Sequence, residues 1–344
     1  MTAIAVSKVQ RLAAVSEMVY EPAHCIVCGH SNADVIAERD DLRAELEELW
    51  GYSEKRLMPA TPPERLKDRL VFSERLPLRL VRCRECGLVY RNPIERSQSL
   101  RAVYGNDAPP RDAMRALHEA QRSTAEAQAR LLRQKLGPGT WSGLEVGSYV
   151  GAFLAAAKDN GLYFEGIDIN RDVSAFARSL GFCVHDGELT SIESERRFDA
   201  LTIWNTFDQL ADPRGTLHAA HRLLRRGGVL ALRVPNGAFY ARFRRWLGPR
   251  KGVARAVART MLAQNNLLSF PYRWGFTPGA IRRLLTEQSF RVRQIKGDVL
   301  VPTADGWTRP WARFEESVVK SLLWPIARRR GSWAPWIEVY AGRD

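Results

Sequence analysis

The sequence predicts an α/β protein with a doubly wound, seven-stranded sheet and a small N-terminal domain that holds most of the cysteines. Three features support this. Short apolar runs alternate with helical stretches after Gly143, a glycine turn follows the first run, and two Cys-x-x-Cys pairs lie upstream. The 344 residues, 45% of them hydrophobic, suffice for one large or two ordinary domains. We expect domains at 1–110 and 111–344.

Seven apolar runs are the candidate strands of the sheet. Helical stretches separate them, as in crossover units that place helices on both faces of a parallel sheet. A polar helix, roughly Asp112 to Leu136, precedes the first run, and Cys183 within the third run is expected to be a buried core thiol. The runs are Gly143–Gly147, Phe164–Ile169, Phe182–His185, Phe198–Trp204, Val229–Val234, Phe290–Lys296 and Trp336–Tyr340.

Four of the five cysteines form two close pairs, Cys25 with Cys28 and Cys83 with Cys86, and a glycine follows each pair. A two-residue gap followed by glycine is typical of a zinc knuckle, and two knuckles supply the four sulfurs of a closed structural zinc site. Disulfides are the alternative, which a reducing compartment disfavours. The pattern therefore indicates structural Zn²⁺ without a catalytic role.

The 54 residues between Cys28 and Cys83 exceed the spacing of an ordinary zinc ribbon. Within this segment, Leu42, Leu46, Leu49 and Trp50 recur at helical spacing, with acidic residues on the opposite side. We expect an inserted amphipathic helix here.

The net charge of +14 is concentrated in one part of the chain. Between Pro213 and Thr286 there is no acidic residue, and the basic residues of this block sum to +15. A protein that coats nucleic acid usually spreads its basic residues over a whole face, so this block needs a local explanation. No apolar run reaches the roughly 18 to 20 residues of a membrane helix, and no signal peptide is evident, so a cytoplasmic location is expected.

The first turn of the alternating region has the features of a ligand-binding turn. The run Leu144–Val146 ends at Gly147, and Gly151 opens the following helix. Glycines here let the backbone approach a ligand at the switch point of an open α/β sheet. The next strand candidate ends in Asp168, 21 residues after Gly147, where a carboxylate can accept the hydroxyls of a ribose.

Five blocks in this order resemble class I S-adenosylmethionine-dependent methyltransferases, which have a Rossmann-like sheet. The resemblance extends from about Gly143 to Ile295, and the upstream cysteine region looks like that of bacterial small-molecule methyltransferases, including sugar methyltransferases. The blocks are LEVGSYVG, EGIDIN, FDALTIWNTFDQLADP, LLRRGGVLALRVPNG and FTPGAIRRLLTEQSFRVRQI.

The resemblance implies roles for individual residues. Glu145 and Gly147 match the turn that holds the methionine part of the cofactor, and Asp168 matches the ribose acid with Ile169 at the adenine. Asn205 follows the fourth strand, whose end faces the sulfonium and the acceptor. The complete set of expected cofactor-binding residues is Glu145, Gly147, Ser148, Tyr149, Gly151, Asp168, Ile169, Asp186, Gly187, Asn205 and Thr206.

The sequence departs from the family pattern at two positions. Tyr149 replaces a glycine of the first block, and Gln209 stands where many relatives have a histidine that can act as a base. Asp208 is the nearest ionisable candidate for a catalytic base, although it reads equally well as a helix cap or surface acid. Tyr104 and His118 lie before the domain, where entry segments fold over the cofactor. The sequence therefore does not identify the catalytic base.

Residues 236–276 lie where this fold often has a substrate cap. Two short basic helices are expected there, one with Phe239 and Phe243 on its packing face, and one with Val253, Val257 and Met261 on a shared face. Their arginines would form a cationic lid for an anionic small-molecule acceptor, such as a nucleotide-linked or lipid-linked sugar or a carrier-bound intermediate. The alternative is a solvated arginine face.

Three other interpretations remain open from the sequence. A nucleic-acid methyltransferase is disfavoured because the fourth strand ends in IWNT, without the Pro-Pro-aromatic motif used on base amines. Peripheral membrane contact is suggested by the basic cap and the tryptophan-rich tail. The departures at Tyr149 and Gln209 also fit a protein that binds the cofactor without catalysis. The oligomeric state and the acceptor atom are not predicted.

Overall fold

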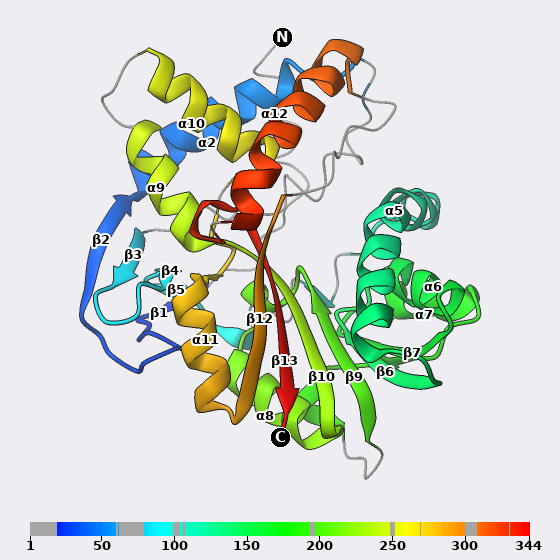
Figure 1. Cartoon of the computed structure of the whole chain (residues 1–344). Coiled ribbons are helices and arrows are strands. Elements are labelled where there is room, and N and C mark those ends of the chain that lie inside the picture. The colour runs from blue at the N-terminus through cyan, green and yellow to red at the C-terminus, as the bar shows by residue number, and fades with distance from the viewer. Residues whose placement is uncertain are drawn as a thin grey trace.

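A computed structural model of the chain describes residues 19–59, 61, 79–98, 104–105, 108–192, 197–247, 252–268, 270–299, 308–329 and 331–344. Its centre is a seven-stranded sheet in the order β12-β13-β10-β9-β6-β7-β8 (Figure 1). Strand β13 runs antiparallel to β10 and β12, and the strands from β10 to β8 are parallel. The predicted α/β fold with a doubly wound, seven-stranded sheet is confirmed.

All seven predicted strands are present, each within a few residues of the predicted bounds. The largest extension is at β10, because its first residues pair with β9 before a register shift between Leu224 and Val229. The strands are β6 (Trp141–Val146), β7 (Leu162–Asp168), β8 (Val184–Asp186), β9 (Phe198–Trp204), β10 (Leu224–Pro235), β12 (Phe290–Asp298) and β13 (Trp336–Arg343).

Helices cover both faces of the sheet. One face is covered by α5, α6 and α7, which lie together in Figure 1, and the other by α8 and α11. The predicted polar helix corresponds to α5. The helices are α5 (Arg111–Leu136), α6 (Ala152–Asp159), α7 (Arg171–Ser179), α8 (Pro213–Leu223) and α11 (Pro278–Glu287).

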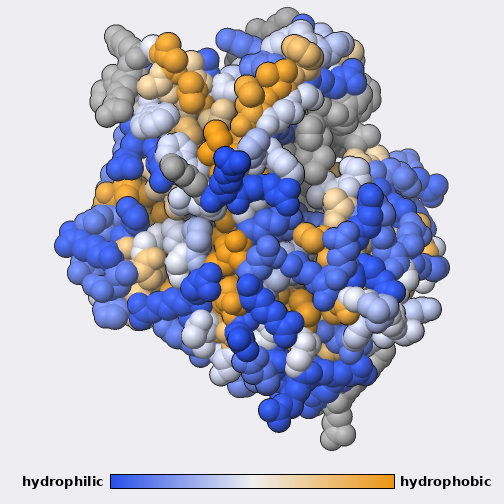
Figure 2. Space-filling view, in the orientation of Figure 1, coloured by the Kyte–Doolittle hydropathy of each residue, from blue (hydrophilic) through white to orange (hydrophobic). Residues whose placement is uncertain are grey.

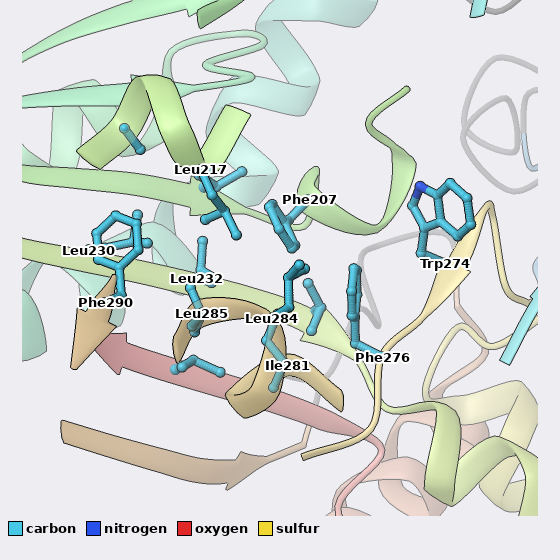
Figure 3. Packing of buried hydrophobic residues seen from close by; sticks show 14 of the residues in the cluster. Phe207, Leu217, Leu230, Leu232, Trp274, Phe276, Ile281, Leu284, Leu285 and Phe290 are labelled. Carbon is cyan, nitrogen blue, oxygen red and sulfur yellow. The ribbon is translucent and has the colours of Figure 1, made fainter. Parts of the chain in front are cut away.

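The largest core cluster lies between the sheet and α8 and α11 (Figure 3). Phe207 belongs to a 3-10 turn, η3 (Phe207–Gln209), that follows β9, and its ring lies 5.2 Å from that of Phe276. Figure 3 shows both rings among leucines of the cluster. Burial of Phe207 therefore fixes the loop that follows β9.

The N-terminal region joins the same core. Its strands β2 (Ala33–Glu38), β3 (Arg79–Cys83) and β4 (Val89–Arg91) form a sheet in which β11 (Trp274–Gly275) is the fourth member. Strands β1 (Tyr20–Glu21) and β5 (Ile94–Glu95) form a separate pair. Because β11 comes from the cap region, the cysteine-bearing segment and the cap share one sheet.

The expected inserted helix is α2 (Arg39–Glu54), and the start of the segment forms β2 instead of helix. Leu42 and Leu49 are buried in a cluster with the cap helices α9 (Gly237–Leu247) and α10 (Val253–Gln264). Glu45 and Glu48 of α2 face the cap and form ion pairs with Arg244 and Arg255. The inserted helix is therefore a support for the cap.

The face that Val253 and Val257 share on α10 is exposed at its N-terminal end. Val253 is 81% exposed and Val257 is 38% exposed, whereas Ala258 and Leu262 are buried. Ala258 and Leu262 belong to the cluster that contains Leu42 and Leu49 of α2. An ion pair joins the same two helices, because Arg255 Nη2 lies 2.8 Å from Glu48 Oε2.

Cys183 is exposed, so the prediction of a buried thiol is wrong. It precedes β8, the last strand of the sheet, and it shares an exposed edge with His185, whose Nε2 lies 2.8 Å from Glu165 Oε2. An edge strand has one neighbour only, so its side chains are less covered than those of central strands. None of the described helices combines the length and apolar character that a bilayer-crossing segment requires.

Candidate active site

The turn between β6 and α6 is built from residues in the left-handed backbone region. Gly147 has φ +72°, Tyr149 has φ +45° and Gly151 has φ +73°. A Cβ on Gly147 would lie 2.5 Å from Thr206 Oγ1, so no larger residue fits without a shift. Gly151 is the N-cap of α6 and provides no side-chain cap. The first N–H groups of α6 are therefore left for a ligand or water.

Asp168, at the end of β7, holds this turn. Its Oδ2 accepts a hydrogen bond from the Tyr149 N–H at 2.9 Å, and its Oδ1 accepts one from the Asn170 N–H at 2.9 Å. Burial raises the pKa of the Asp168 carboxyl, and these backbone donors oppose that rise. A carboxylate oxygen carries a second lone pair, so the pair of oxygens can still accept ribose hydroxyls.

The residues after β9 reach the same turn. Asn205 has φ +56°, an uncommon conformation for a residue with a side chain, and Thr206 packs against Gly147. The Asn205 carbonyl accepts a hydrogen bond from Gln209 Nε2 at 2.8 Å, and its Oδ1 accepts one from Arg233 Nη1 at 2.7 Å. Gln209, which cannot act as a base, thus stabilises a strained residue of the site.

Two acids of the site are buried without full hydrogen bonding. Glu145 is buried, and its Oε2 has no hydrogen-bond partner. Burial, with a smaller contribution from Asp168, raises the pKa of the Glu145 carboxyl well above its ordinary value. Asp208 is 0% exposed, neither of its oxygens has a partner among the described residues, and burial raises its pKa well above its ordinary value. Burial thus disfavours the charged form of this candidate base.

The remaining candidates lie around the rim of the turn. The Gly187 N–H donates to the Asp168 carbonyl at 2.8 Å, whereas the side chain of Asp186 is exposed and pairs with Arg178 at 3.0 Å. Ile169 is half-buried. The Ser148 side chain points at Gly166, where a Cβ would lie 2.4 Å from its Oγ. Ser148 therefore contributes its backbone rather than its hydroxyl to the turn.

The segment before β6 contacts the residues around the turn. His118 on α5 is buried, and its Nδ1 lies 2.8 Å from the Val150 carbonyl oxygen. The Tyr104 carbonyl accepts a hydrogen bond from Asn170 Nδ2 at 2.9 Å. Both residues thus support the turn from outside.

The four paired cysteines converge on one point. Cys25 Sγ lies 3.3 Å from Cys86 Sγ, Cys28 Sγ lies 3.4 Å from Cys83 Sγ, and all four sulfurs lie within 4.8 Å of one another. A disulfide needs about 2.05 Å, while sulfurs around a tetrahedral zinc lie about 3.8 Å apart. The glycines after the pairs have φ +76° and +74°, as the knuckle turns require. The donor set and its spacing therefore fit a tetrahedral metal ion.

A buried guanidinium, which the sequence shows only as part of the basic block, lies near Glu95 and Tyr104. Arg273 is 3% exposed, and its Nε and Nη1 have no hydrogen-bond partner within the described part of the chain. Its neighbour Trp274 donates to the Leu210 carbonyl in the loop after β9 at 2.9 Å. Burial lowers the pKa of Arg273, while Glu95 and Tyr104 raise it. An arginine stays charged in proteins, so this cation has unused donors.

Most other charges of the basic block have partners. Arg244 pairs with Glu45 at 2.9 Å and Arg255 with Glu48 at 2.8 Å, while Arg242 stacks on Trp333. Two arginines of the expected cationic lid, Arg244 and Arg255, are thus paired with acids of α2. The other paired arginines of the block are Arg214, Arg225, Arg233 and Arg283.

Comparison with known proteins identifies the class. Residues 115–295 match the model of a family described as a methyltransferase domain, which is more than half of the chain. The chain belongs to this family. Together with the strand order and the glycine turn, this makes the protein a class I S-adenosylmethionine-dependent methyltransferase.

Solved structures similar to this chain have low sequence identity. One is an S-adenosylmethionine-dependent methyltransferase from Thermotoga maritima, with 14% identity, 67% of this chain and 92% of that chain covered, and a TM-score of 0.44. Another, from Mesorhizobium loti, has 16% identity, 65% and 98% coverage, and a TM-score of 0.43. A glycopeptide N-methyltransferase bound to S-adenosylmethionine has 14% identity, 64% and 94% coverage, and a TM-score of 0.41. No curated protein matches the sequence at a significant level.

Proposed function

We propose that the protein transfers the methyl group of S-adenosylmethionine to a small-molecule acceptor that carries negative charge. The observation that supports the acceptor class is Arg273, a buried guanidinium whose Nε and Nη1 have no partner among the described residues, and whose neighbour Trp274 contacts the loop after β9. Buried donors of this kind are costly unless a ligand satisfies them. A phosphate or carboxylate on the acceptor would accept a charge-assisted hydrogen bond from one of these nitrogens.

The cofactor supplies an electrophilic methyl group, and the chain would hold and orient it. Asp168 would accept the ribose hydroxyls, and Ile169 with the Asp186–Gly187 segment would border the adenine. The turn at Gly147, Ser148, Tyr149 and Gly151, together with Glu145, would face the methionine part. Asn205 and Thr206 would border the reacting end. Because methyl transfer is an in-line displacement, this positioning would supply much of the rate.

The acceptor test uses Arg273→Met and Arg273→Lys with a matched control, Arg245→Met, which removes an exposed arginine of the cap. The assay follows label transfer from S-adenosylmethionine to nucleotide sugars, glycolipids and carrier-bound intermediates. Loss of a charge-assisted hydrogen bond should raise the acceptor KM by about tenfold or more in Arg273→Met. Arg273→Lys should recover part of this loss, and Arg245→Met should behave as the wild type.

Cofactor affinity, measured by calorimetry, should be unchanged in all three variants, which separates loss of the acceptor contact from loss of the fold. An acceptor KM that does not change in Arg273→Met would refute the anionic subsite. Methylation of RNA or DNA, or a gel shift at low salt, would favour the nucleic-acid alternative. Cofactor binding without transfer to any acceptor would favour a protein that has lost catalysis.

For the cysteine cluster we propose a structural Zn²⁺ held by Cys25, Cys28, Cys83 and Cys86. A closed four-sulfur site ties the segment after β1 to the β3–β4 turn, and Val27 and Tyr90 beside it are buried. Purified protein should contain one zinc per chain. Cys83→Ser should lower that content and the thermal midpoint, whereas Cys183→Ser, at the exposed cysteine, should change neither. Full zinc content in Cys83→Ser would contradict the site.

A further inference from the structure

Helix α12 (Pro310–Arg329) differs from an ordinary surface helix, because it buries two charged residues and exposes large apolar ones. Its buried residues recur every three or four positions, which defines the inward side. That side contains an ion pair, because Glu316 and Lys320 are buried and in contact. The inward residues are Ala312, Glu316, Lys320, Leu323 and Ala327.

The outward side of α12 is apolar. Phe314 is 74% exposed and Leu322 is 70% exposed, and Val318 lies between them on the same side. Figure 2 shows hydrophobic residues along this helix on the face turned toward the viewer. The exposed large apolar residues of the helix are Trp311, Phe314, Val318, Leu322, Trp324 and Ile326. We call this set the α12 apolar face.

Among the described residues of α12, all of the exposed charges are positive. The two acids of the helix face the protein: Glu315 pairs with Arg56 at 2.6 Å, and Glu316 pairs with Lys320. Arg313, Arg328 and Arg329 are exposed, and the Arg328 guanidinium lies over the Trp324 ring at 4.4 Å. An exposed apolar strip with basic residues only is typical of a helix that lies at an anionic interface.

The cap extends this surface. Val253 and Val257 of α10 are exposed, and its Met261 packs against a cluster that includes Leu323 and Ala327 of α12. Figure 1 shows α9, α10 and α12 at one end of the molecule. The arrow of β13 points away from that end, and β13 is antiparallel to β10. The parallel strands therefore end toward α10 and α12, on the side where the cofactor turn lies.

We propose that the α12 apolar face, together with Val253 and Val257, docks on the surface of an anionic lipid membrane. The helix of 20 residues would lie in the plane of the interface over about 30 Å. Its apolar side chains would enter the acyl boundary, the arginines would contact lipid phosphates, and Trp311 and Trp324 would lie at the interface. This contact would bring the carboxyl ends of the strands toward the membrane.

The positive charge around the α12 apolar face favours an anionic lipid surface as its binding partner over a second copy of the chain. Two copies joined through this face would bring their exposed arginines together, and like charges at an interface are unfavourable. An anionic bilayer complements both the apolar strip and its basic border. The inference concerns docking and is independent of the acceptor class.

The test is co-sedimentation of the full chain with vesicles of phosphatidylcholine and phosphatidylglycerol, compared with pure phosphatidylcholine. Phe314→Ser/Leu322→Ser removes the two most exposed side chains of the face and should lower the partition coefficient by about tenfold or more. Arg328→Glu/Arg329→Glu should remove the preference for anionic vesicles. The matched control is Tyr163→Ser/Leu180→Ser, at exposed apolar residues elsewhere, which should bind as the wild type.

Thermal midpoints should not fall in the α12 variants, since the altered side chains are exposed. Cofactor affinity should also stay at the wild-type value, so failure to dock would be distinguishable from failure of the methyltransferase site. Wild-type protein that stays in the supernatant with anionic vesicles would overturn the proposal. So would a wild-type dimer that Phe314→Ser/Leu322→Ser converts to a monomer, because the face would then be a contact between copies.

Discussion

Replacing Gly147 with alanine should remove most of the affinity for S-adenosylmethionine. The added Cβ would lie 2.5 Å from Thr206 Oγ1 and 2.8 Å from Thr206 Cγ2, and the backbone has φ +72°. The left-handed conformation costs about 1–2 kcal/mol for a residue with a Cβ. Relief of the clash must move Thr206 or the turn, and both border the proposed cofactor site. Calorimetry should show a dissociation constant raised by about a hundredfold or more, equivalent to about 2.7 kcal/mol.

Gly161→Ala is the matched control for this change. Gly161 has φ +69°, and nothing lies within 4 Å of an added Cβ, so this variant has the backbone cost without the clash. Its cofactor affinity should equal that of the wild type. In Gly147→Ala/Thr206→Ala the closest atoms are removed, and part of the affinity should return. Equal affinities in Gly147→Ala and Gly161→Ala would show that the close approach to Thr206 has no role in binding.

The sheet could be predicted from the sequence because its signals are local. Apolar runs, a glycine turn and an acid at the end of the next strand need no knowledge of the tertiary structure. The same holds for Gly147 and Asp168, which the structure brings to one turn. The paired spacing of the four cysteines is also visible in the sequence, and their sulfurs lie close together as expected.

Orientation of the cap could not be predicted, because it depends on residues far away in the sequence. The buried side of α10, with Ala258 and Leu262, packs against Leu49 of α2, and the ion pair between the two helices joins Arg255 and Glu48, 207 positions apart. The burial of Arg273 depends in the same way on strands from the N-terminal region, where Arg91 donates its backbone N–H to the Arg273 carbonyl. A count of charges along the chain therefore overestimates the positive charge of the cap that has no acidic partner. It also misses Arg273, a buried cation with two nitrogens that have no partner among the described residues.

Arg233 is also a buried arginine, and its contacts link the sheet to the loop after β9. It lies inside β10 with 1% of its side chain exposed, and its Nε donates to Asp298 Oδ2 at 3.0 Å. Glu338 is its cross-strand partner on β13, and Lys296 lies 2.9 Å from Glu338. Two cations and two acids thus balance within the sheet. The remaining donor, Nη1, holds the side chain of Asn205 in its strained conformation.

Arg233→Met should lower the free energy of unfolding by about 3–5 kcal/mol. The variant keeps both acids, Asp298 and Glu338, but only one cation, Lys296, to balance them. Arg233→Met/Asp298→Asn restores the charge balance and should recover part of that loss in chemical denaturation. Cofactor affinity should not recover in the double variant, since the hydrogen bond to Asn205 stays broken. Recovery of both stability and affinity would show that Arg233 acts on the fold alone. Recovery of stability without affinity would identify it as a positioning residue for the loop after β9.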